Sequence, residues 1–160
     1  MTAIKFGTDG WRAIIAQEYT VDNVKRVAEG TGRWMLQQGM KQVAIGHDTR
    51  FAGELFAETS ARVLGALGIK VMLAKGYVST PMVSLATFKT GSGLGVVITA
   101  SHNPPSYNGF KLKSHLGGPL APAQITEVED LIPEQCTLEL PELEELQSKG
   151  LLEYVNMEQM

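Results

Sequence analysis

Residues 94–113, LGVVITASHNPPSYNGFKLK, contain the strongest indication of how this chain folds. Residues 94–99 form an apolar run rich in β-branched side chains, which is typical of a buried strand. A polar loop containing Pro104 and Pro105 follows, and residues 110–113 then alternate between apolar and polar as a strand does. Since that loop is too short for the crossover that joins parallel strands, the second strand is predicted to return antiparallel to the first.

Two earlier apolar runs predict further buried strands, at residues 43–46 and 71–74. The segments between and before the runs have helical patterns. The expected helices lie between Thr20 and Gly39, over residues 53–67, and from a Thr80 cap through Pro81 to Gly91. Strands and helices in this order predict a three-layer α/β/α domain with a mixed, mostly parallel sheet whose last strand is antiparallel.

The C-terminal part of the chain has a weaker pattern. Residues 125–132 predict one more amphipathic helix, which Pro133 ends. From Glu134 onward the sequence is rich in Glu and Leu, which fits either a helix packed on a neighbouring domain or a solvated linker. We therefore expect residues 1–135 to form one domain and residues 136–160 to be a linker or the start of the next domain.

Composition excludes several classes of protein. The 160 residues suffice for one domain, and 44% hydrophobic with 19% charged residues is ordinary for a soluble globular protein. A net charge of −3 gives no reason to expect a nucleic acid, so phosphate chemistry would depend on local positive groups. Cys136 is the only cysteine, and no apolar run is long enough to span a membrane. These features predict a cytoplasmic protein without a membrane partner.

Three polar segments follow the carboxyl ends of the predicted strands: His47-Asp48, Gly76-Tyr77 and Ser101-His102. In open α/β sheets, ligand crevices form at this edge. We therefore expect the three segments to converge there, although His47 and His115 are lone histidines with no sign of a ligand role.

The Ser101 loop allows three interpretations. It could be a plain polar connection, or Ser101 could attack an acyl group with His102 as its base. The second is weakened because adjacent residues in an extended loop usually point in different directions, and no Gly-x-Ser-x-Gly turn is present. Alternatively, Ser101 carries a phosphoryl group, which adds about two negative charges. The positive groups available to balance it are Arg12, Arg50, His102, Lys111 and Lys113.

Several motifs together resemble the phosphoglucomutase/phosphomannomutase superfamily. They are FGTDGWR (residues 6–12), GHDTR (46–50), STP (79–81), TASHNP (99–104) and YNGFK (107–111). The resemblance covers about residues 4–132, in the order that the family has them. It implies the N-terminal domain of a phosphohexomutase, an intramolecular phosphotransferase of the isomerase class.

The resemblance also implies roles for single residues. Ser101 would be the phosphorylated serine, and its phosphate would supply one ligand to Mg²⁺. Lys111 and Arg12 would neutralise the transferring group, with Lys111 a candidate general acid or base. His102 and Asn103 would shape the phosphate site. Asp48 and Arg50 are expected to brace the loop through an ion pair.

The implied reaction interconverts hexose 1-phosphate and hexose 6-phosphate through a hexose 1,6-bisphosphate, which also serves as primer. Glucose and mannose phosphates are the expected substrates, with glucosamine phosphate as the alternative. Family members have four domains, and no Asp-x-Asp-x-Asp metal loop occurs in this chain. We therefore expect the remaining Mg²⁺ ligands in missing C-terminal domains, and this chain alone to be inactive. A truncated or stand-alone phosphosugar-binding module without turnover is the other hypothesis.

Overall fold

The computed structural model describes residues 3–7 and 10–160, and in them a sheet of six strands has the order β1-β5-β4-β2-β3-β6. The strands are β1 (Trp11–Ile14), β2 (Gln42–His47), β3 (Lys70–Ala74), β4 (Leu94–Ile98), β5 (Tyr107–Ser114) and β6 (Leu152–Val155). The helices are α1 (Val21–Gln37), α2 (Gly53–Ala66), α3 (Thr80–Lys89), α4 (Pro122–Asp130), α5 (Leu143–Ser148) and the 3-10 turn η1 (Met157–Gln159).

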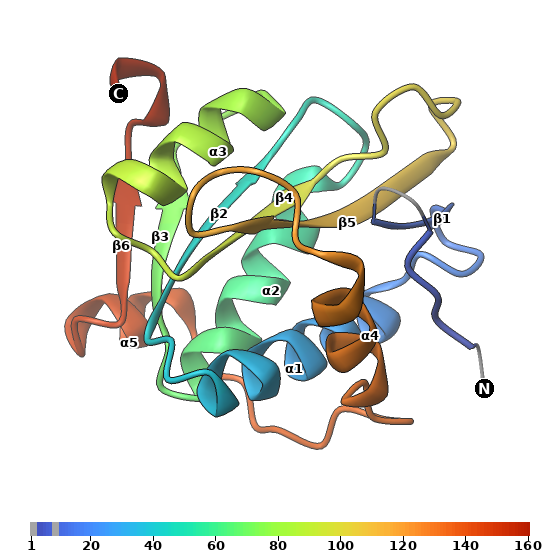
Figure 1. Cartoon of the computed structure of the whole chain (residues 1–160), viewed down its shortest axis with the longest axis horizontal. Helices are drawn as coiled ribbons and strands as arrows, with labels where there is room; N and C mark the ends of the chain where they lie inside the picture. The colour runs from blue at the N-terminus through green and yellow to red at the C-terminus, as the bar shows by residue number, and fades with distance from the viewer. Residues whose placement is uncertain (1–2, 8–9) are drawn as a thin grey trace.

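The three-layer α/β/α architecture with a mixed sheet is confirmed. Strands β2, β3, β4 and β6 run parallel, and β5 returns antiparallel to β4, as its short loop predicts. Helices α1 and α2 cover one face of the sheet and α3 covers the other (Figure 1). The edge strands β1 and β6 have no counterpart in the sequence-based prediction, because each has only four residues.

Helix ends follow the capping signals with one correction. Thr20 caps α1 by accepting a hydrogen bond from the Asn23 amide, as predicted. For α3, the sequence predicts Thr80 as the cap, but Ser79 takes that position and its hydroxyl accepts from the Met82 amide at 3.4 Å. Thr80 is therefore the first helical residue and Pro81 the second, where a proline still loses no helical hydrogen bond.

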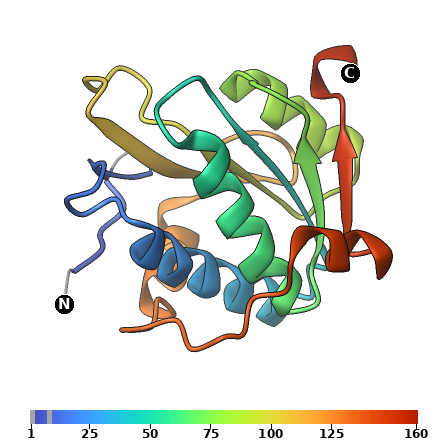
Figure 2. The ribbon, with the colours of Figure 1, turned by 180° about the vertical axis from the view of Figure 1, so that it is seen from behind.

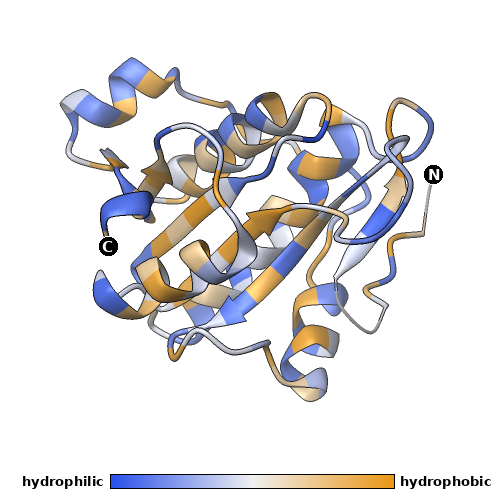
Figure 3. Cartoon of the chain, turned by 90° about the horizontal axis from the view of Figure 1, so that it is seen from above, coloured by the Kyte–Doolittle hydropathy of each residue, from blue (hydrophilic) through white to orange (hydrophobic). Residues whose placement is uncertain are grey.

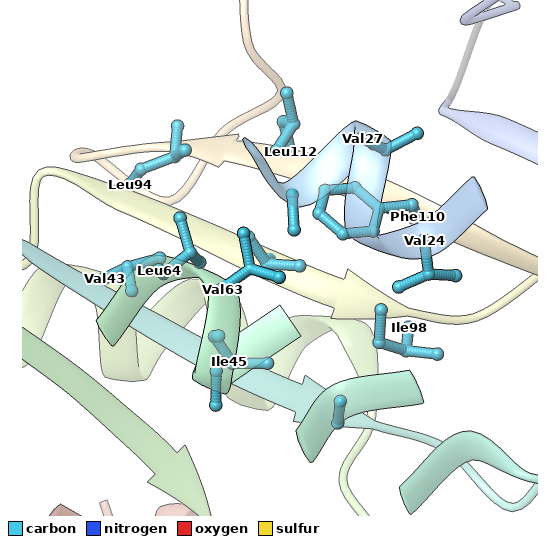
Figure 4. Close-up of a cluster of buried hydrophobic side chains, with 14 of the residues drawn as sticks. Val24, Val27, Val43, Ile45, Val63, Leu64, Leu94, Ile98, Phe110 and Leu112 are labelled. Atoms are coloured by element: carbon cyan, nitrogen blue, oxygen red, sulfur yellow. The ribbon is translucent and has the colours of Figure 1, made fainter. Parts of the chain in front are cut away.

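The main core lies between the sheet and the pair α1 and α2. Valines from α1 and residues of α2 meet apolar side chains from β2, β4 and β5 (Figure 4). The hydropathy view shows the central strands as mostly hydrophobic and the outer helices as mixed (Figure 3). A smaller core under α3 contains Val83, Ala86 and Val97. The sheet is thus apolar on both faces, as a mostly parallel sheet requires.

The segment after residue 142 packs on the same sheet. Leu146 of α5 is 1% exposed and fits against Gly65 of α2, where a Cβ would approach the leucine side chain to 2.6 Å. Strand β6 then pairs with β3 from Val71 to Ala74. The division of the chain at residue 135 stays a prediction, but α5 and β6 are integral parts of this fold. No helix in the described residues is long and apolar enough to cross a membrane.

Gly109 sets the spacing between β1 and the end of β4. A Cβ there would lie 2.5 Å from the Thr99 carbonyl oxygen and 2.8 Å from that of Trp11. The Gly109 carbonyl accepts hydrogen bonds from the Tyr19 hydroxyl at 2.7 Å and the Thr99 amide at 3.2 Å. Only glycine allows both backbones to approach this closely.

The substitution Gly109→Ala is expected to lower the free energy of unfolding by about 1–3 kcal/mol, because the new methyl group overlaps two backbone carbonyls that cannot move cheaply. Urea unfolding of the purified chain measures this as a lower midpoint. Gly118→Ala is the control, since no atom lies within 4 Å of a Cβ there. Equal midpoints for the two variants would contradict this account of the strand spacing.

Candidate active site

The carboxyl edge of the sheet brings together the three polar segments that the sequence predicts. The Asp48 amide, just after β2, donates to the Ile98 carbonyl at the end of β4. The Val78 amide, in the loop after β3, donates to the His47 carbonyl at 2.9 Å. Residues far apart in the sequence therefore form one surface at this edge.

Ser101 is exposed in the loop that leaves β4, and its backbone is strained. Its φ is +53°, in the left-handed region that a residue with a Cβ adopts at a cost. The Ser101 amide donates to the Thr99 hydroxyl at 3.2 Å, and the Asn103 amide donates to the Ala100 carbonyl at 3.0 Å. The loop thus presents the Ser101 side chain to solvent on a tight, defined turn.

Arg50 fixes the position of this loop. Its guanidinium donates hydrogen bonds of 2.8–3.0 Å to four backbone carbonyls, those of Ser101, Asn103, Pro104 and Tyr107. A planar group with five fixed donors suits such an arrangement, whereas a lysine could not reach all four acceptors. Arg50 therefore holds the conformation of the Ser101 loop rather than pointing at a ligand.

Asp48 contacts both Arg50 and Thr99, the residue that follows β4. One carboxylate oxygen accepts from the Arg50 amide at 3.1 Å. The other accepts a short hydrogen bond from the Thr99 hydroxyl and lies 3.8 Å from the Arg50 Nε. The expected bracing ion pair is present. Thr99, which the sequence predicts only as a strand residue, links Asp48 to the Ser101 amide.

Arg12 and Asn103 meet at the same place. The Arg12 Nη1 donates to the Asn103 side-chain oxygen at 2.9 Å, which ties β1 to the Ser101 loop. Arg12 lies directly opposite Gly109 in the β1–β5 pair, and Lys111 is two residues further along β5. Because side chains alternate along a strand, Arg12 and Lys111 lie on one face of the sheet. Lys111 is 5% exposed, so its charge is held within the protein.

The other residues of the motifs are placed as follows. His102 is exposed, and in the described part of the chain no hydrogen bond joins it to the Ser101 hydroxyl, so His102 is not placed as the base of an acyl-transfer serine. Trp11 is 3% exposed and its ring stacks on Tyr19 with 4.6 Å between the ring centroids, so it belongs to the core. Thr8 and Asp9 of the first motif lie outside the described residues.

Tyr19 is a functional support that sequence reasoning missed. Burial, with a smaller effect of the Asp48 charge, raises the pKa of its hydroxyl well above the ordinary value. The phenol therefore stays protonated and donates to the Gly109 carbonyl. A single tyrosine in a polar turn gives no sequence signal for this, since the contact joins residues 90 positions apart.

The surface beside Ser101 is an open depression of about 420 Å³, lined in part by Asp48, Arg50, Phe51, Ser101 and Asn103. It could accept a polar ligand that reaches the serine hydroxyl. The described residues contain no group of three or more His, Cys, Asp or Glu that could hold a metal ion. A phosphate on Ser101 fits as one oxygen ligand for Mg²⁺, which prefers six, so the others would come from elsewhere.

Comparison with known proteins agrees with this architecture. Residues 3–138 match the model of the family described as phosphoglucomutase/phosphomannomutase, alpha/beta/alpha domain I. The chain belongs to this family. The motifs that surround Ser101 are therefore those of the family's first domain.

Several relatives of this phosphohexomutase-family domain have known names. The chain is 31% identical to a phosphoglucomutase of Staphylococcus saprophyticus, over 97% of the chain and 29% of the relative. It is 40% identical to a phosphoglucosamine mutase of Alkaliphilus metalliredigens, over 76% of the chain and 27% of the relative. The chain thus spans about 30% of the length of these curated relatives.

Solved structures give the same result. A protein from Thermus thermophilus solved as a candidate phosphomannomutase is 39% identical, with a TM-score of 0.88 over 98% of this chain and 34% of that one. A phosphoglucomutase/phosphomannomutase family protein from Burkholderia thailandensis is 26% identical, with a TM-score of 0.74 over 94% of this chain and 32% of that one. Both contain much more chain than the domain described.

The positive φ of Ser101 predicts different effects of two small residues. Ser101→Gly is expected to be more stable than Ser101→Ala by about 0.5–1 kcal/mol, because glycine relieves the left-handed strain and this outweighs its larger unfolded-state entropy. Thermal and urea unfolding of the two variants measure the difference. Equal stability would mean that the loop relaxes and stores no strain at Ser101.

The carboxylate of Asp48 should be needed for stability as well as for any activity. Asp48→Asn is expected to lower the free energy of unfolding by about 1–3 kcal/mol. The neutral amide loses the ion pair with Arg50 and accepts a weaker hydrogen bond from the Thr99 hydroxyl. Asp130→Asn removes the same charge at an exposed position and is the control. Unchanged stability with loss of activity alone would instead assign Asp48 a direct catalytic role.

Proposed function

We propose that this chain is the catalytic-serine domain of a phosphohexomutase that interconverts hexose 1-phosphate and hexose 6-phosphate. The observation that carries the proposal is the exposed Ser101 on a strained turn, held by Arg50 through four carbonyls. Such rigidity suits a group that must receive and donate a phosphoryl group along one line. Glucose and mannose phosphates are the proposed substrates.

In the proposed reaction, phosphorylated Ser101 donates to a hydroxyl of the sugar. The bond between the Ser101 oxygen and phosphorus breaks and a bond from the sugar oxygen to phosphorus forms. The sugar hydroxyl gives its proton to a general base, for which Lys111 is the candidate, and the freed Ser101 oxygen takes up a proton. The resulting hexose 1,6-bisphosphate reorients, and the Ser101 oxygen loses its proton and forms a bond to its other phosphorus. The bond from that phosphorus to the sugar oxygen breaks, and the sugar oxygen takes up a proton. This divides one difficult transfer into two steps through a covalent intermediate.

The proposed roles of the neighbouring residues follow from their positions. Arg12 and Lys111, on one face of the sheet, would offset charge on the moving phosphoryl group, and Lys111 is the candidate acid or base. Asn103, fixed by Arg12, and the exposed His102 would bind phosphate oxygens. Mg²⁺ bound to the Ser101 phosphate would add further charge neutralisation when present.

The rest of the enzyme is proposed to lie in C-terminal domains of a longer polypeptide, since this chain spans only 27–29% of the named relatives. Those domains would supply the remaining metal ligands, the sugar contacts and the site for the far phosphate. A phosphoglucosamine mutase is the alternative within the family, because relatives with that name are also similar. We further propose a cytoplasmic location, the compartment that fits the single Cys136.

The full-length polypeptide is expected to carry phosphate on Ser101 and to show mutase turnover with Mg²⁺ and a hexose 1,6-bisphosphate primer. Ser101→Ala should lower turnover by at least about a thousandfold, because no other group receives the phosphoryl group. Ser106→Ala, an exposed serine in the same loop, is the matched control and should keep activity. Mass spectrometry and a coupled assay provide the two readouts.

The 160-residue chain alone should fold but show no mutase turnover in the same assay. This domain would form only one side of the active site, so it cannot hold both ends of the substrate. Such positioning lowers the activation barrier by roughly 7–11 kcal/mol. Turnover by the short chain that Ser101→Ala abolishes would show that the other domains are dispensable. An active full-length Ser101→Ala variant would overturn the role of Ser101.

A further inference from the structure

A second hollow opens at the carboxyl edge, and it shares no lining residue with the depression beside Ser101. It measures about 420 Å³ and lies between α2, the loop after β3, and β6. Figure 2 shows that β3 and β6 point to the edge at which α2 begins. Its polar lining comes from His47, Glu54, Glu58, Lys75, Tyr77 and Tyr154.

His47 presents an acceptor to this hollow. The residue is 5% exposed, and its Nδ1 lies 2.9 Å from the Asp48 carbonyl oxygen, which can only accept. Nδ1 therefore carries the proton, and in the neutral ring Nε2 keeps its lone pair. Among the described residues, none donates to Nε2. The ring is edge-on to Tyr77 at 5.7 Å.

Negative charge gathers on the α2 wall of the hollow. Glu54 and Glu58 are one helical turn apart on α2, and both line the hollow. Burial first, and then the Glu54 charge, raises the pKa of Glu58. Burial and the nearby carboxylates, Glu58 foremost, also raise the pKa of Tyr154. In both residues burial is the larger cause of the pKa shift, and the neighbouring carboxylates add to it.

Within the described residues, neither carboxylate of this wall forms an ion pair with a positive group, although the His47 charge acts to lower the pKa of Glu58. Lys75 also lines the hollow, but it is exposed and pairs with neither Glu54 nor Glu58 in the described residues. Two carboxylates, a histidine lone pair and tyrosine rings are together suited to an ammonium or guanidinium group. The missing component is therefore a cation with N–H donors.

The rim indicates that this cation belongs to a protein surface. Tyr77, which lines the hollow, is 68% exposed, and Leu55, next to Glu54 in the first turn of α2, is 49% exposed. A small free amine would leave these apolar side chains in water, whereas a docked protein surface would cover them. The first-named curated relative has about 70% of its length outside the matched region, which provides such a surface.

We propose that a lysine or arginine side chain from the remaining part of the full-length protein inserts between Glu54, Glu58 and His47, while Tyr77 and Leu55 pack around it. The proposal rests on the proposed function, because its occupant is the rest of the phosphohexomutase polypeptide. The contact would fix the other domains next to the Ser101 crevice without taking part in the chemistry.

Amide hydrogen exchange of the full-length protein and of the 160-residue chain tests this docking. Peptides covering residues 51–58 and 75–78 should exchange at least about tenfold more slowly in the full-length protein, a difference of about 1.4 kcal/mol. The full-length double variant Glu54→Gln, Glu58→Gln should lose most of that protection. The double variant Glu134→Gln, Glu139→Gln removes the same charge from exposed positions and should keep it.

Equal exchange in the two forms, or protection that survives the Glu54→Gln, Glu58→Gln change, would overturn the proposal. Protection of the short chain by n-butylammonium chloride, with none in the full-length protein, would overturn it in favour of a free-amine site. Ser101 phosphorylation is measured in the same samples. Phosphorylation without protection rejects the docking alone, and protection without phosphorylation rejects the proposed function alone.

Discussion

The arrangement of this domain around its serine depends on the Arg50 guanidinium and the four backbone carbonyls that it binds. A loop that contains two prolines and a residue at positive φ has few hydrogen bonds of its own. Its carbonyl groups would otherwise be satisfied by water, and the loop would sample several conformations. Arg50 replaces that solvent with one rigid, charged donor group, and Asp48 keeps the donor in place.

Arg50 can bind the Ser101 loop only because the sheet places Arg50 and this loop side by side. Arg50 follows β2 and the loop follows β4, and these strands are paired in parallel with Ile45 opposite Val96. Parallel pairing places both carboxyl ends at one edge, so a single side chain can join residues 51 positions apart. Antiparallel β5 and β1 then bring Lys111 and Arg12 to the same edge, with Gly109 allowing the close approach.

Much of this fold can be predicted from the sequence because the signals are local. The apolar runs at residues 43–46, 71–74 and 94–99 identify the central strands, and the short loop after Ser101 predicts the antiparallel return. The edge strands β1 and β6 were not predicted, since their pairing comes from partners distant in sequence rather than from their own four-residue patterns. For the same reason the Glu/Leu-rich segment did not reveal that Leu146 is buried against α2.

The order of the elements, the strand that delivers Ser101 and the identity of the residues at the carboxyl edge can be read from the amino-acid sequence, because they depend on periodicity, glycine and proline positions and short motifs. The contacts that those residues make follow from the three-dimensional fold. In the fold, Arg50 binds the carbonyls of the Ser101 loop, and Trp11 stacks on the buried Tyr19. Glu54, Glu58 and His47 line one hollow. Such roles depend on distances between atoms remote in the chain, and sequence spacing does not determine those distances.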